Sequence, residues 1–319
     1  MEETSAPAFL ERRTSVGTSV ASRMRLALSR QRELSPICPA MPRLDGSLAL
    51  VTGGNADIGK AIGDGLAARG AEVVIAARGE ALAREVVAGM FSTHGVAAHA
   101  LRLDLSDLSG VASFIDTLAR LLAGRKIAHL VQNAGVWPQS YARSAQGHEI
   151  AFATNVLGHF ALTLGLMEAG LLADSSRVVV QTGDIYIMAK DCTPDFSYRG
   201  AWGGMLAYCR SKLGNLWFAR ELQRRHPALE VVVAHPGVVA SGLVKTDNRV
   251  TEYLRRAILL DPTAGAQTAL TLATQPGLRE AVYYHNTGGR MLLSAQDPAL
   301  DATKAAALWD TLSVLRGSV

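Results

Sequence analysis

We predict the fold from residues 48–60, which read Leu-Ala-Leu-Val-Thr-Gly-Gly-Asn-Ala-Asp-Ile-Gly-Lys. A short apolar run passes into a glycine-bearing turn, and the turn passes into a helix-like stretch. This is the order of a βα unit that opens a nucleotide-binding sheet. Glycines let such a turn curl tightly, so that backbone N–H groups at the positive end of the helix can approach a pyrophosphate. The stretch alone does not distinguish a phosphate-binding turn from a plain turn, so the rest of the chain must supply the context.

The same pattern continues along the chain, where apolar runs rich in β-branched residues alternate with helical stretches. The expected strands cover residues 48–52, 72–77, 97–103, 127–131, 177–182 and 230–234. The expected helices cover residues 58–69, 80–94, 108–123, 146–172 and 204–225. Strict alternation, with strands that are apolar on both faces, is typical of a parallel sheet covered by helices on both sides. We therefore predict an α/β fold with a doubly wound, Rossmann-like parallel sheet, in a single domain over residues 41–319.

The composition is that of an ordinary folded protein, with 319 residues of which 49% are hydrophobic. The net charge of +4 forms no basic stripe, because Arg and Glu alternate along the chain, and we expect no nucleic-acid partner. The three cysteines have no metal-ligand spacing and suit no disulfide framework, so we expect a cytoplasmic protein without a structural metal. The most apolar stretch, residues 156–172, is too short and too interrupted by polar residues to predict a membrane span.

Residues 1–40 are rich in Ser and Arg and show neither strand alternation nor a helical stripe. We expect them to form a disordered N-terminal extension. Two alternatives stay open. The extension could be a transit peptide, which its acidic residues argue against, or translation could begin at Met41.

Tyr208 and Lys212 carry the acid–base chemistry that we expect. They lie at the start of the helical stretch 204–225, so the phenol and the ammonium are one turn apart on one face. Because an ammonium stabilises phenolate, we expect Lys212 to lower the pKa of Tyr208 and Tyr208 to exchange a proton with a carbonyl or alcohol oxygen. Tyr186 and Lys190 have the same spacing, but Tyr186 follows a strand too closely to lie on a long helix.

Five features of the chain resemble the short-chain dehydrogenase/reductase family, in the family's order. They are the glycine-rich turn at 52–59, Asn133-Ala134-Gly135 after a strand, Asn155, the Tyr208–Lys212 pair and Pro236-Gly237. The resemblance covers residues 44–290, and its motifs are specific as a set although each is weak singly. Within the family, His148-Glu149 and residues 155–160, 211–215 and 265–268 are similar to the retinol dehydrogenase and WW-domain oxidoreductase branch.

The resemblance implies roles for the matching residues. Tyr208 would be the catalytic acid/base, Lys212 would bind the nicotinamide ribose, and Asn155 would hold a water that relays protons to Lys212. The implied cofactor-binding residues are Gly53, Asn55, Asp57, Ile58, Gly59, Arg78, Asp104, Leu105, Asn133, Ala134, Gly135, Tyr208, Lys212, Pro236, Gly237 and Val238, with Ser241 added at the carboxamide end of nicotinamide.

Two departures from the family pattern bear on the site. The family's turn has the form Thr-Gly-x-x-x-Gly-x-Gly, and Asp57 stands at its middle glycine. A carboxylate there would repel a pyrophosphate unless it points outward, so we expect Asp57→Gly to tighten cofactor binding. The family's catalytic serine usually closes the strand before the active-site loop, where this chain has Thr182 and then Gly183. We expect Thr182 to orient the substrate oxygen, with a vacant role as the alternative.

The end of the second expected strand guides the choice of cofactor. A site that prefers NAD has an Asp or Glu here to bind the ribose 2′-hydroxyl, and residues 73–78 contain neither. Arg78 offers a bidentate partner for a 2′-phosphate instead, although it could also be a solvated side chain. We predict NADP(H) as the preferred cofactor and NAD(H) as the alternative.

Apolar side chains in an expected loop, residues 194–204, and in an expected flap, residues 239–260, suggest a pocket for an apolar small molecule, or else packing of these segments on the sheet. Our first hypothesis is an NAD(P)-dependent oxidoreductase that transfers a hydride between nicotinamide and an alcohol or carbonyl. The alternatives are a catalytically impaired regulatory or scaffold protein of the same fold, and a reductase of activated C=C bonds. Helices 155–172 and 204–225 resemble those through which family members pair, so we also expect a homodimer or homotetramer.

Overall fold

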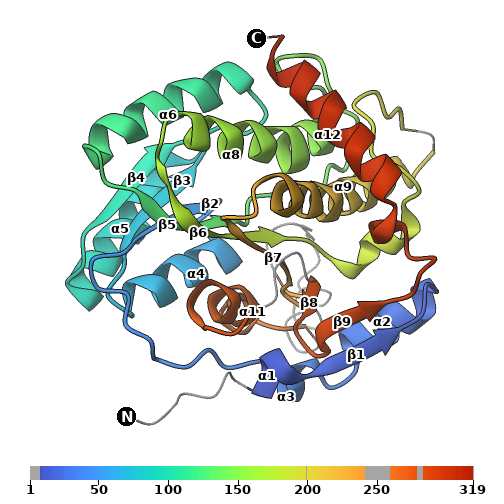
Figure 1. The fold of residues 1–319 in the computed structure, drawn as a ribbon, viewed down its shortest axis with the longest axis horizontal. Helices are drawn as coiled ribbons and strands as arrows, with labels where there is room; N and C mark the ends of the chain where they lie inside the picture. The colour runs from blue at the N-terminus through green and yellow to red at the C-terminus, as the bar shows by residue number, and fades with distance from the viewer. Residues whose placement is uncertain (1–7, 199, 241–258, 279–282, 319) are drawn as a thin grey trace.

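The computed structural model describes residues 8–198, 200–240, 259–278 and 283–318, which form a nine-stranded sheet with helices on both faces (Figure 1). The strands are β1 (Arg13–Val16), β2 (Leu48–Thr52), β3 (Glu72–Ala77), β4 (Ala98–Arg102), β5 (Ile127–Gln132), β6 (Leu172–Gln181), β7 (Glu230–His235), β8 (Tyr283–His285) and β9 (Gly289–Leu293). The helices are α1 (Ala8–Glu11), α2 (Val20–Leu28), α3 (Gln31–Leu34), α4 (Asp57–Ala67), α5 (Glu80–His94), α6 (Leu108–Leu122), α7 (Ile150–Phe152), α8 (Gly158–Glu168), α9 (Gly203–Arg225), α11 (Pro262–Thr274) and α12 (Ala302–Arg316). The strand order is β1-β9-β8-β7-β6-β5-β2-β3-β4, and only the β8–β9 pair is antiparallel among the described strands. The predicted single-domain, doubly wound α/β fold is confirmed.

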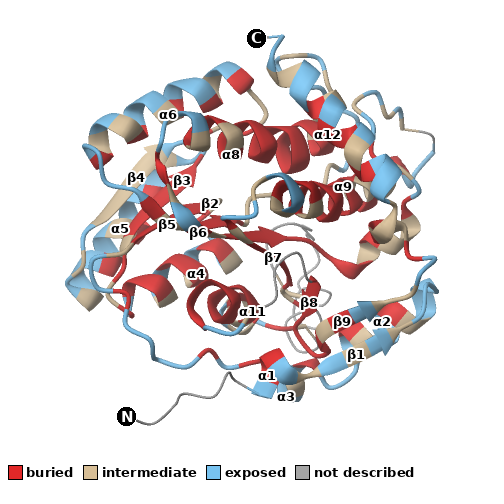
Figure 2. Cartoon of the chain, viewed as in Figure 1, coloured by how far each residue is buried: buried red, intermediate tan, exposed pale blue. Residues whose placement is uncertain are grey.

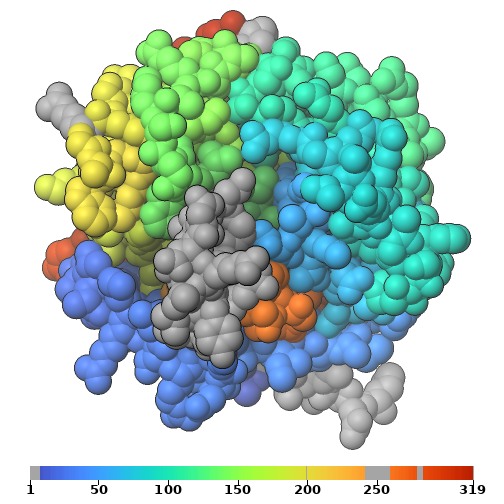
Figure 3. All heavy atoms as spheres, turned by 180° about the vertical axis from the view of Figure 1, so that it is seen from behind, coloured from blue at the N-terminus to red at the C-terminus, as the bar shows by residue number. Residues whose placement is uncertain are grey.

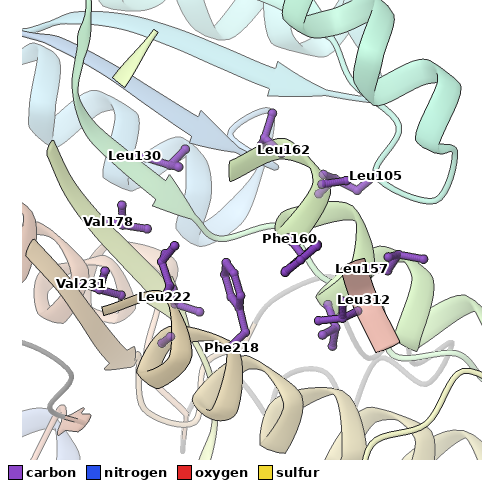
Figure 4. Close-up of a cluster of buried hydrophobic side chains, with 14 of the residues drawn as sticks. Leu105, Leu130, Leu157, Phe160, Leu162, Val178, Phe218, Leu222, Val231 and Leu312 are labelled. Atoms are coloured by element: carbon purple, nitrogen blue, oxygen red, sulfur yellow. The ribbon is translucent and has the colours of Figure 1, made fainter. Parts of the chain in front are cut away.

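The central strands are apolar on both faces, which is why helices cover the sheet on both sides. In β2, Leu48 and Leu50 face one hydrophobic cluster and Ala49 faces the other. The first cluster includes side chains of α6, α8, α9 and α12, with Phe160 and Phe218 in edge contact at 5.9 Å between ring centroids (Figure 4). The second cluster includes side chains of α4, α5 and α11. Figure 2 shows the buried residues along the strands and on the inward helix faces.

The largest departure from the predicted elements lies in the stretch expected as one helix over residues 146–172. It consists of α7, a π-helical turn, η1 (Ala153–Leu157), and α8. It ends at Glu168, because β6 already begins at Leu172, several residues before the predicted start at 177. The early start of β6 comes with a shift in its register on β5 between Ile127 and His129, which an apolar pattern alone does not reveal.

The N-terminal segment, residues 8–40, is not the disordered extension that the sequence suggested. Residues 13–16 form β1, which pairs in parallel with β9 and becomes the outermost strand of the sheet. Phe9 and Leu10 are buried against the second hydrophobic cluster. In Figure 3 this segment, in dark blue, forms part of the outer surface of the protein. The prediction was wrong because the order of these residues comes from partners near residue 290 and not from a local pattern.

One helical stretch among the described residues, Ile150–Glu168, has the length and composition of a membrane span, with 19 residues and a mean hydropathy of 1.5. However, 83% of its most apolar window is buried inside the protein. Core helices of globular proteins share this composition, so the stretch is weak evidence for a span. The expected absence of a membrane span stays a prediction.

The parallel pairing brings the carboxyl ends of β2, β5, β6 and β7 to one edge of the sheet. Residues that the sequence analysis singled out follow these strands directly: Gly53 follows β2, Asn133 follows β5, Thr182 follows β6 and Pro236 follows β7. Open α/β sheets bind their ligands at this edge. The fold therefore gathers the predicted site residues in one place.

Candidate active site

The glycine turn after β2 is closed so tightly that side chains do not fit inside it. Gly53 has a φ of +66°, and a Cβ on Gly59 would lie 2.3 Å from the carbonyl oxygen of Gly53. The hydroxyl of Thr52 accepts hydrogen bonds from the N–H groups of Asn133 and Ala134, both at 3.1 Å. The turn is thus tied to the end of β5. Its tight backbone at the start of α4 fits the pyrophosphate of a dinucleotide.

Asp57 occupies a backbone conformation that normally selects glycine. Its φ is +47°, and it is one of the few non-glycine residues with positive φ among those described. Asp57 is the first residue of α4 and is exposed, whereas Ile58 is half-buried. The aspartate therefore replaces the family's glycine at a position where the backbone itself favours glycine, and its side chain lies at the surface of the glycine turn.

The residues predicted for the adenosine end follow β3 and β4. Arg78 is exposed directly after β3, and the amide nitrogen of Asn55 lies 3.3 Å from where a Cβ on Gly79 would be. Asp104 is half-buried and accepts hydrogen bonds from the N–H and hydroxyl of Ser106 at 3.0 and 2.7 Å. The structure thus brings Asn55 close to Gly79, the residue after Arg78, and places Asp104 in the loop after β4. A further predicted residue, Leu105, is buried.

Tyr208, Lys212, Asn155 and Gly135 come together on the α9 side of the sheet. The Lys212 ammonium lies 5.3 Å from the centre of the Tyr208 ring and donates a hydrogen bond to the carbonyl of Gln181 at 3.3 Å. A Cβ on Gly135 would lie 3.7 Å from the Lys212 nitrogen and 3.5 Å from the amide oxygen of Asn155. The predicted Tyr–Lys pair and the Asn-Ala-Gly segment therefore share one site.

Burial controls the ionisation of this pair. It lowers the pKa of Lys212 to about 8. Burial also raises the pKa of Tyr208 above its usual range, and the neighbouring Cys209 adds to the rise. The net shift of the Tyr208 pKa is therefore upward and not downward as expected, because desolvation of the phenolate dominates it, and the effect of Lys212 on this pKa stays a prediction. At neutral pH the phenol is protonated and can donate.

Asn155 braces the site through its side chain. It lies in the π-helical turn η1, a feature that often marks functional positions. Its amide oxygen accepts from the N–H of Val136 at 2.8 Å, and its amide nitrogen donates to the carbonyl of Val136 at 3.0 Å and to the hydroxyl of Ser211 at 2.9 Å. These bonds join the segment after β5 to α9. The predicted role of Asn155 in holding a water stays a prediction.

The Thr182 hydroxyl is engaged within the protein in this structure. It is buried and donates a hydrogen bond to the backbone carbonyl of Lys212 at 2.8 Å. Gly183, which follows, has no side chain to offer. In this structure Thr182 helps to hold the backbone of α9, and both its expected role toward the substrate oxygen and the alternative of a vacant serine role stay predictions.

Trp137, which was not among the predicted site residues, stacks on the Tyr208 ring. The two ring centroids are 4.9 Å apart and the planes differ by 5°. The start of α9 packs against the same segment, because a Cβ on Gly204 would lie 1.9 Å from the carbonyl oxygen of Pro138. Trp137 thus covers one face of the catalytic phenol. The only sequence feature that could have indicated this role is its position, five residues after the end of a parallel strand.

Pro236, Gly237 and Val238 follow β7, with a φ of +90° at Gly237. The N–H of Val238 donates to the side chain of Gln31 at 3.1 Å, and its carbonyl accepts from the N–H of Leu260 at 3.0 Å. The backbone of Val238 is therefore already engaged within the protein, so its predicted contact with a cofactor would have to come from its side chain and stays a prediction. Ser241 lies outside the described residues.

A buried cluster of Asp184, His235 and His285 lies next to Gly183, and its potential ligand atoms are within 4.8 Å of one another. The Nδ1 atom of His285 accepts a hydrogen bond from the N–H of Thr287 at 3.2 Å, so its proton is on Nε2, which is 3.2 Å from Asp184. A metal-bound histidine normally donates from its other nitrogen. His235 is neutral, because burial lowers its pKa to about 3. Because Nε2 of His285 carries the proton, it has no lone pair to offer a metal on the side that faces Asp184. Both ring nitrogens of His235 lack a hydrogen-bond partner among the described residues.

Tyr186 and Lys190, the second pair with the same spacing, do not form a catalytic pair. Tyr186 is fully buried in a 3-10 helix, η2 (Asp184–Met188), and its hydroxyl donates to both carboxylate oxygens of Asp297, at 3.0 and 3.1 Å. Lys190 lies beyond the end of η2 and is exposed. The tertiary structure thus distinguishes the Tyr208–Lys212 pair from the Tyr186–Lys190 pair, although both have the same spacing in the sequence.

Comparison with known proteins agrees with this geometry. The sequence profile of the family described as short chain dehydrogenase matches residues 47–252. Human retinol dehydrogenase 11 is 34% identical over 293 residues, which cover 89% of this chain and 90% of the human protein. Mouse polyprenol dehydrogenase is 33% identical over 290 residues, which cover 87% and 83%. A solved structure of a short chain dehydrogenase from Burkholderia cenocepacia J2315 in complex with NADP is 26% identical, with a TM-score of 0.60, and covers 78% of this chain and 99% of that chain.

The fold and the site therefore define a nicotinamide-dependent oxidoreductase, and the chain belongs to the short-chain dehydrogenase family. Within this family it falls in the retinol dehydrogenase branch, whose human and mouse members are 30–35% identical to it. Enzymes of this kind act on alcohols or carbonyls. Neither the site geometry nor the comparisons favour the catalytically impaired alternative.

Proposed function

We propose that this protein is an NADP(H)-dependent dehydrogenase/reductase of apolar alcohols or carbonyls. The proposal rests on one observation: the Tyr208–Lys212 pair and the tight glycine turn lie at the same edge of a parallel sheet. The bound dinucleotide would supply or accept a hydride. The residues of this chain supply the proton, the binding groups and the exclusion of water.

Tyr208 is the proton donor in carbonyl reduction and the acceptor in the reverse direction. Its raised pKa favours the donor role, because the phenol keeps its proton at neutral pH. Lys212 lies beside it with a positive charge at pH 7, since its lowered pKa is still about 8. The ammonium is placed to favour the phenolate that remains after the proton has been given to the substrate oxygen.

Arg78 supports the preference for NADP(H). It is exposed at the end of β3, where a 2′-phosphate would lie, and β3 ends without a carboxylate. Among the described residues Arg78 has no ion pair, so its guanidinium is available for a bidentate contact. The NADP complex of the Burkholderia relative is consistent with this choice.

An apolar substrate is supported by Trp137, which lies against the catalytic phenol, and by the printed names of the relatives, which refer to retinol and polyprenol. Two aromatic residues of the loop 194–204, Phe196 and Tyr198, contact neighbouring side chains of the protein. Phe196 lies under the guanidinium of Arg210, and the hydroxyl of Tyr198 donates to Glu149 at 2.5 Å. The residues expected as a flap lie mostly outside the described part of the chain.

The test is a spectrophotometric assay at 340 nm, the band of reduced nicotinamide, with a panel of apolar and polar alcohols and carbonyls. We expect turnover of apolar substrates, at least tenfold higher kcat/KM with NADPH than with NADH, and loss of this preference in Arg78→Ala. Tyr208→Phe should bind NADPH and fail to turn over. Equal use of both dinucleotides would contradict the NADP(H) preference. Turnover by Tyr208→Phe would contradict the assignment of the proton donor, and product identification would reveal a C=C reductase.

Two further expectations remain proposals. Pairing of subunits through α8 and α9 would have to use surface that α12 leaves free, because Trp309 of α12 packs on Phe160 and Phe218. Light scattering after size-exclusion chromatography measures the oligomeric state. A cytoplasmic location is supported by three free, buried cysteines and is checked by localising a tagged protein.

A further inference from the structure

The N-terminal segment reaches the active-site edge of the sheet through Gln31. This side chain belongs to α3 and is 3% exposed. Its amide oxygen accepts from the N–H of Val238 at 3.1 Å, and its amide nitrogen donates to the carbonyl of Val238 at 3.4 Å. Gln31 therefore pairs with both backbone groups of a residue in the segment that the family resemblance assigns to the nicotinamide end of the cofactor.

The position of α3 is fixed by contacts with the turn between β8 and β9. The guanidinium of Arg12 donates to the carbonyls of Leu34 and Thr287 at 3.0 and 2.6 Å. The side chain of Asn286 donates to the hydroxyl of Ser35 at 2.9 Å. These hydrogen bonds hold α3 in place. The contact of Gln31 with Val238 therefore connects the N-terminal segment to the residues that follow β7.

The hydrogen bonds of Val238 determine the direction in which the backbone N–H and carbonyl of Val239 point. Leu260 donates to Val238 and accepts from Ala240, so the N–H and carbonyl of Val239 point away from Leu260. Within the described chain these two groups of Val239 make no hydrogen bond. The side chain of Val239 packs near Gly265, and Gly265 is also close to Ile58 at the start of α4. The free backbone pair therefore borders the dinucleotide-binding turn.

We propose that Gln31 is a positioning residue for the nicotinamide end of the cofactor. A carboxamide needs one acceptor for its N–H and one donor for its oxygen, and Val239 offers both from adjacent backbone atoms. By holding Val238 on the opposite side, Gln31 keeps residues 238–240 extended with this pair facing the cofactor. The inference rests on the proposed dinucleotide-dependent function, and it makes the N-terminal segment part of the binding site.

The test compares two ligands that differ only in the nicotinamide ring. Gln31→Met keeps the length of the side chain and removes both hydrogen bonds. We expect calorimetry to show that this variant binds NADP⁺ about five- to tenfold more weakly than the natural protein, since one or two hydrogen bonds are lost. Binding of 2′-phospho-ADP-ribose, which lacks the nicotinamide ring, should change by less than about twofold. A general structural defect would weaken both ligands alike.

Matched variants separate the possible outcomes. Glu33→Gln alters an exposed side chain of the same helix that is paired with Arg30, and both ligands should bind as before. Gln31→Glu keeps an acceptor for the Val238 N–H and should recover part of the NADP⁺ affinity, so it serves as a second test if Gln31→Met folds poorly. Equal losses for the two ligands, or no loss for NADP⁺, would overturn the role of Gln31. If the natural protein binds neither NADP⁺ nor NAD⁺, the proposed function itself fails.

Discussion

Lys212 shows how one buried side chain can be both a structural and a chemical element. Its ammonium donates to the carbonyl of Gln181 and lies beside the Tyr208 ring, and burial brings its pKa down to about 8. The desolvation of Lys212 thus brings the lysine close to losing its charge at physiological pH. Two opposite shifts of pKa, upward for Tyr208 and downward for Lys212, follow from the same desolvation.

The lowered pKa of Lys212 predicts a fall in carbonyl reduction at alkaline pH. Since Tyr208 keeps its proton to higher pH, Lys212 loses its proton first. We expect kcat/KM to be constant below about pH 8 and to fall about tenfold per pH unit above it. The residual activity of Lys212→Arg should not show this fall, because a guanidinium stays charged. A natural profile that stays level up to pH 10 would contradict the assignment.

Two substitutions of Asp57 separate the effect of its backbone conformation on cofactor binding from the effect of its charge. Asp57→Gly removes the carboxylate and suits the φ of +47°, whereas Asp57→Asn removes only the charge and still tolerates this conformation. If repulsion of the pyrophosphate dominates, both variants should bind NADP⁺ about five- to tenfold more tightly at low salt, with a smaller gain at high salt. Calorimetry at two ionic strengths measures this. An unchanged dissociation constant in both variants would show that Asp57 does not oppose the cofactor.

Among the elements, the close approach of α8 to the loop after β4 controls the geometry of the site. Gly158 begins α8 directly after the π-helical turn that contains Asn155, and a Cβ on Gly158 would lie 2.1 Å from the carbonyl oxygen of Leu105. Only a glycine allows this contact without a backbone shift. The position of Asn155 beside Lys212 thus depends on a residue that carries no chemistry itself.

Gly158→Ala should therefore destabilise the protein by about 1–3 kcal/mol, because the added methyl group collides with backbone that cannot rotate away. Gly89→Ala is the matched control, since Gly89 lies in α5 with open space around it. It should leave the stability unchanged or raise it by up to about 1 kcal/mol. Urea denaturation followed by circular dichroism measures both. Similar effects of the two substitutions would rule out the steric explanation.

At the scale of the whole molecule, Arg23 ties the N-terminal segment to the core. This fully buried guanidinium pairs with Asp297 and with Asp184, which follows Gly183 at the active-site edge. The hydroxyl of Tyr283 also donates to Asp184, at 2.6 Å. The ion pairs join residues that are more than 150 positions apart in the chain, so they are formed only in the folded protein.

Removing the charge of Arg23 should leave two buried carboxylates without their cation. We expect Arg23→Met to lower the free energy of unfolding by about 3–5 kcal/mol. Arg25→Met changes an exposed arginine of the same helix and should alter it by less than about 0.5 kcal/mol. Chemical denaturation of both variants gives the comparison. A loss below 1 kcal/mol in Arg23→Met would mean that the N-terminal segment is only loosely attached.

The sequence by itself determined the alternation of strands and helices, the glycine turn and the Tyr208–Lys212 pair. These features are local: the apolar pattern sets the period of each element, and a spacing of four residues places two side chains on one helical face. The end of α5 at His94 and the start of α9 near Gly204 were predictable for the same reason.

Only the tertiary structure decided the role of β1, the partner of the Thr182 hydroxyl, the stacking of Trp137 on Tyr208, and the direction in which the pKa of Tyr208 moves. Each of these depends on groups that are distant in the chain, or on how far water is excluded from a site. Such contacts and desolvation arise when the sheet and its helices pack together, and no local pattern of residues encodes them.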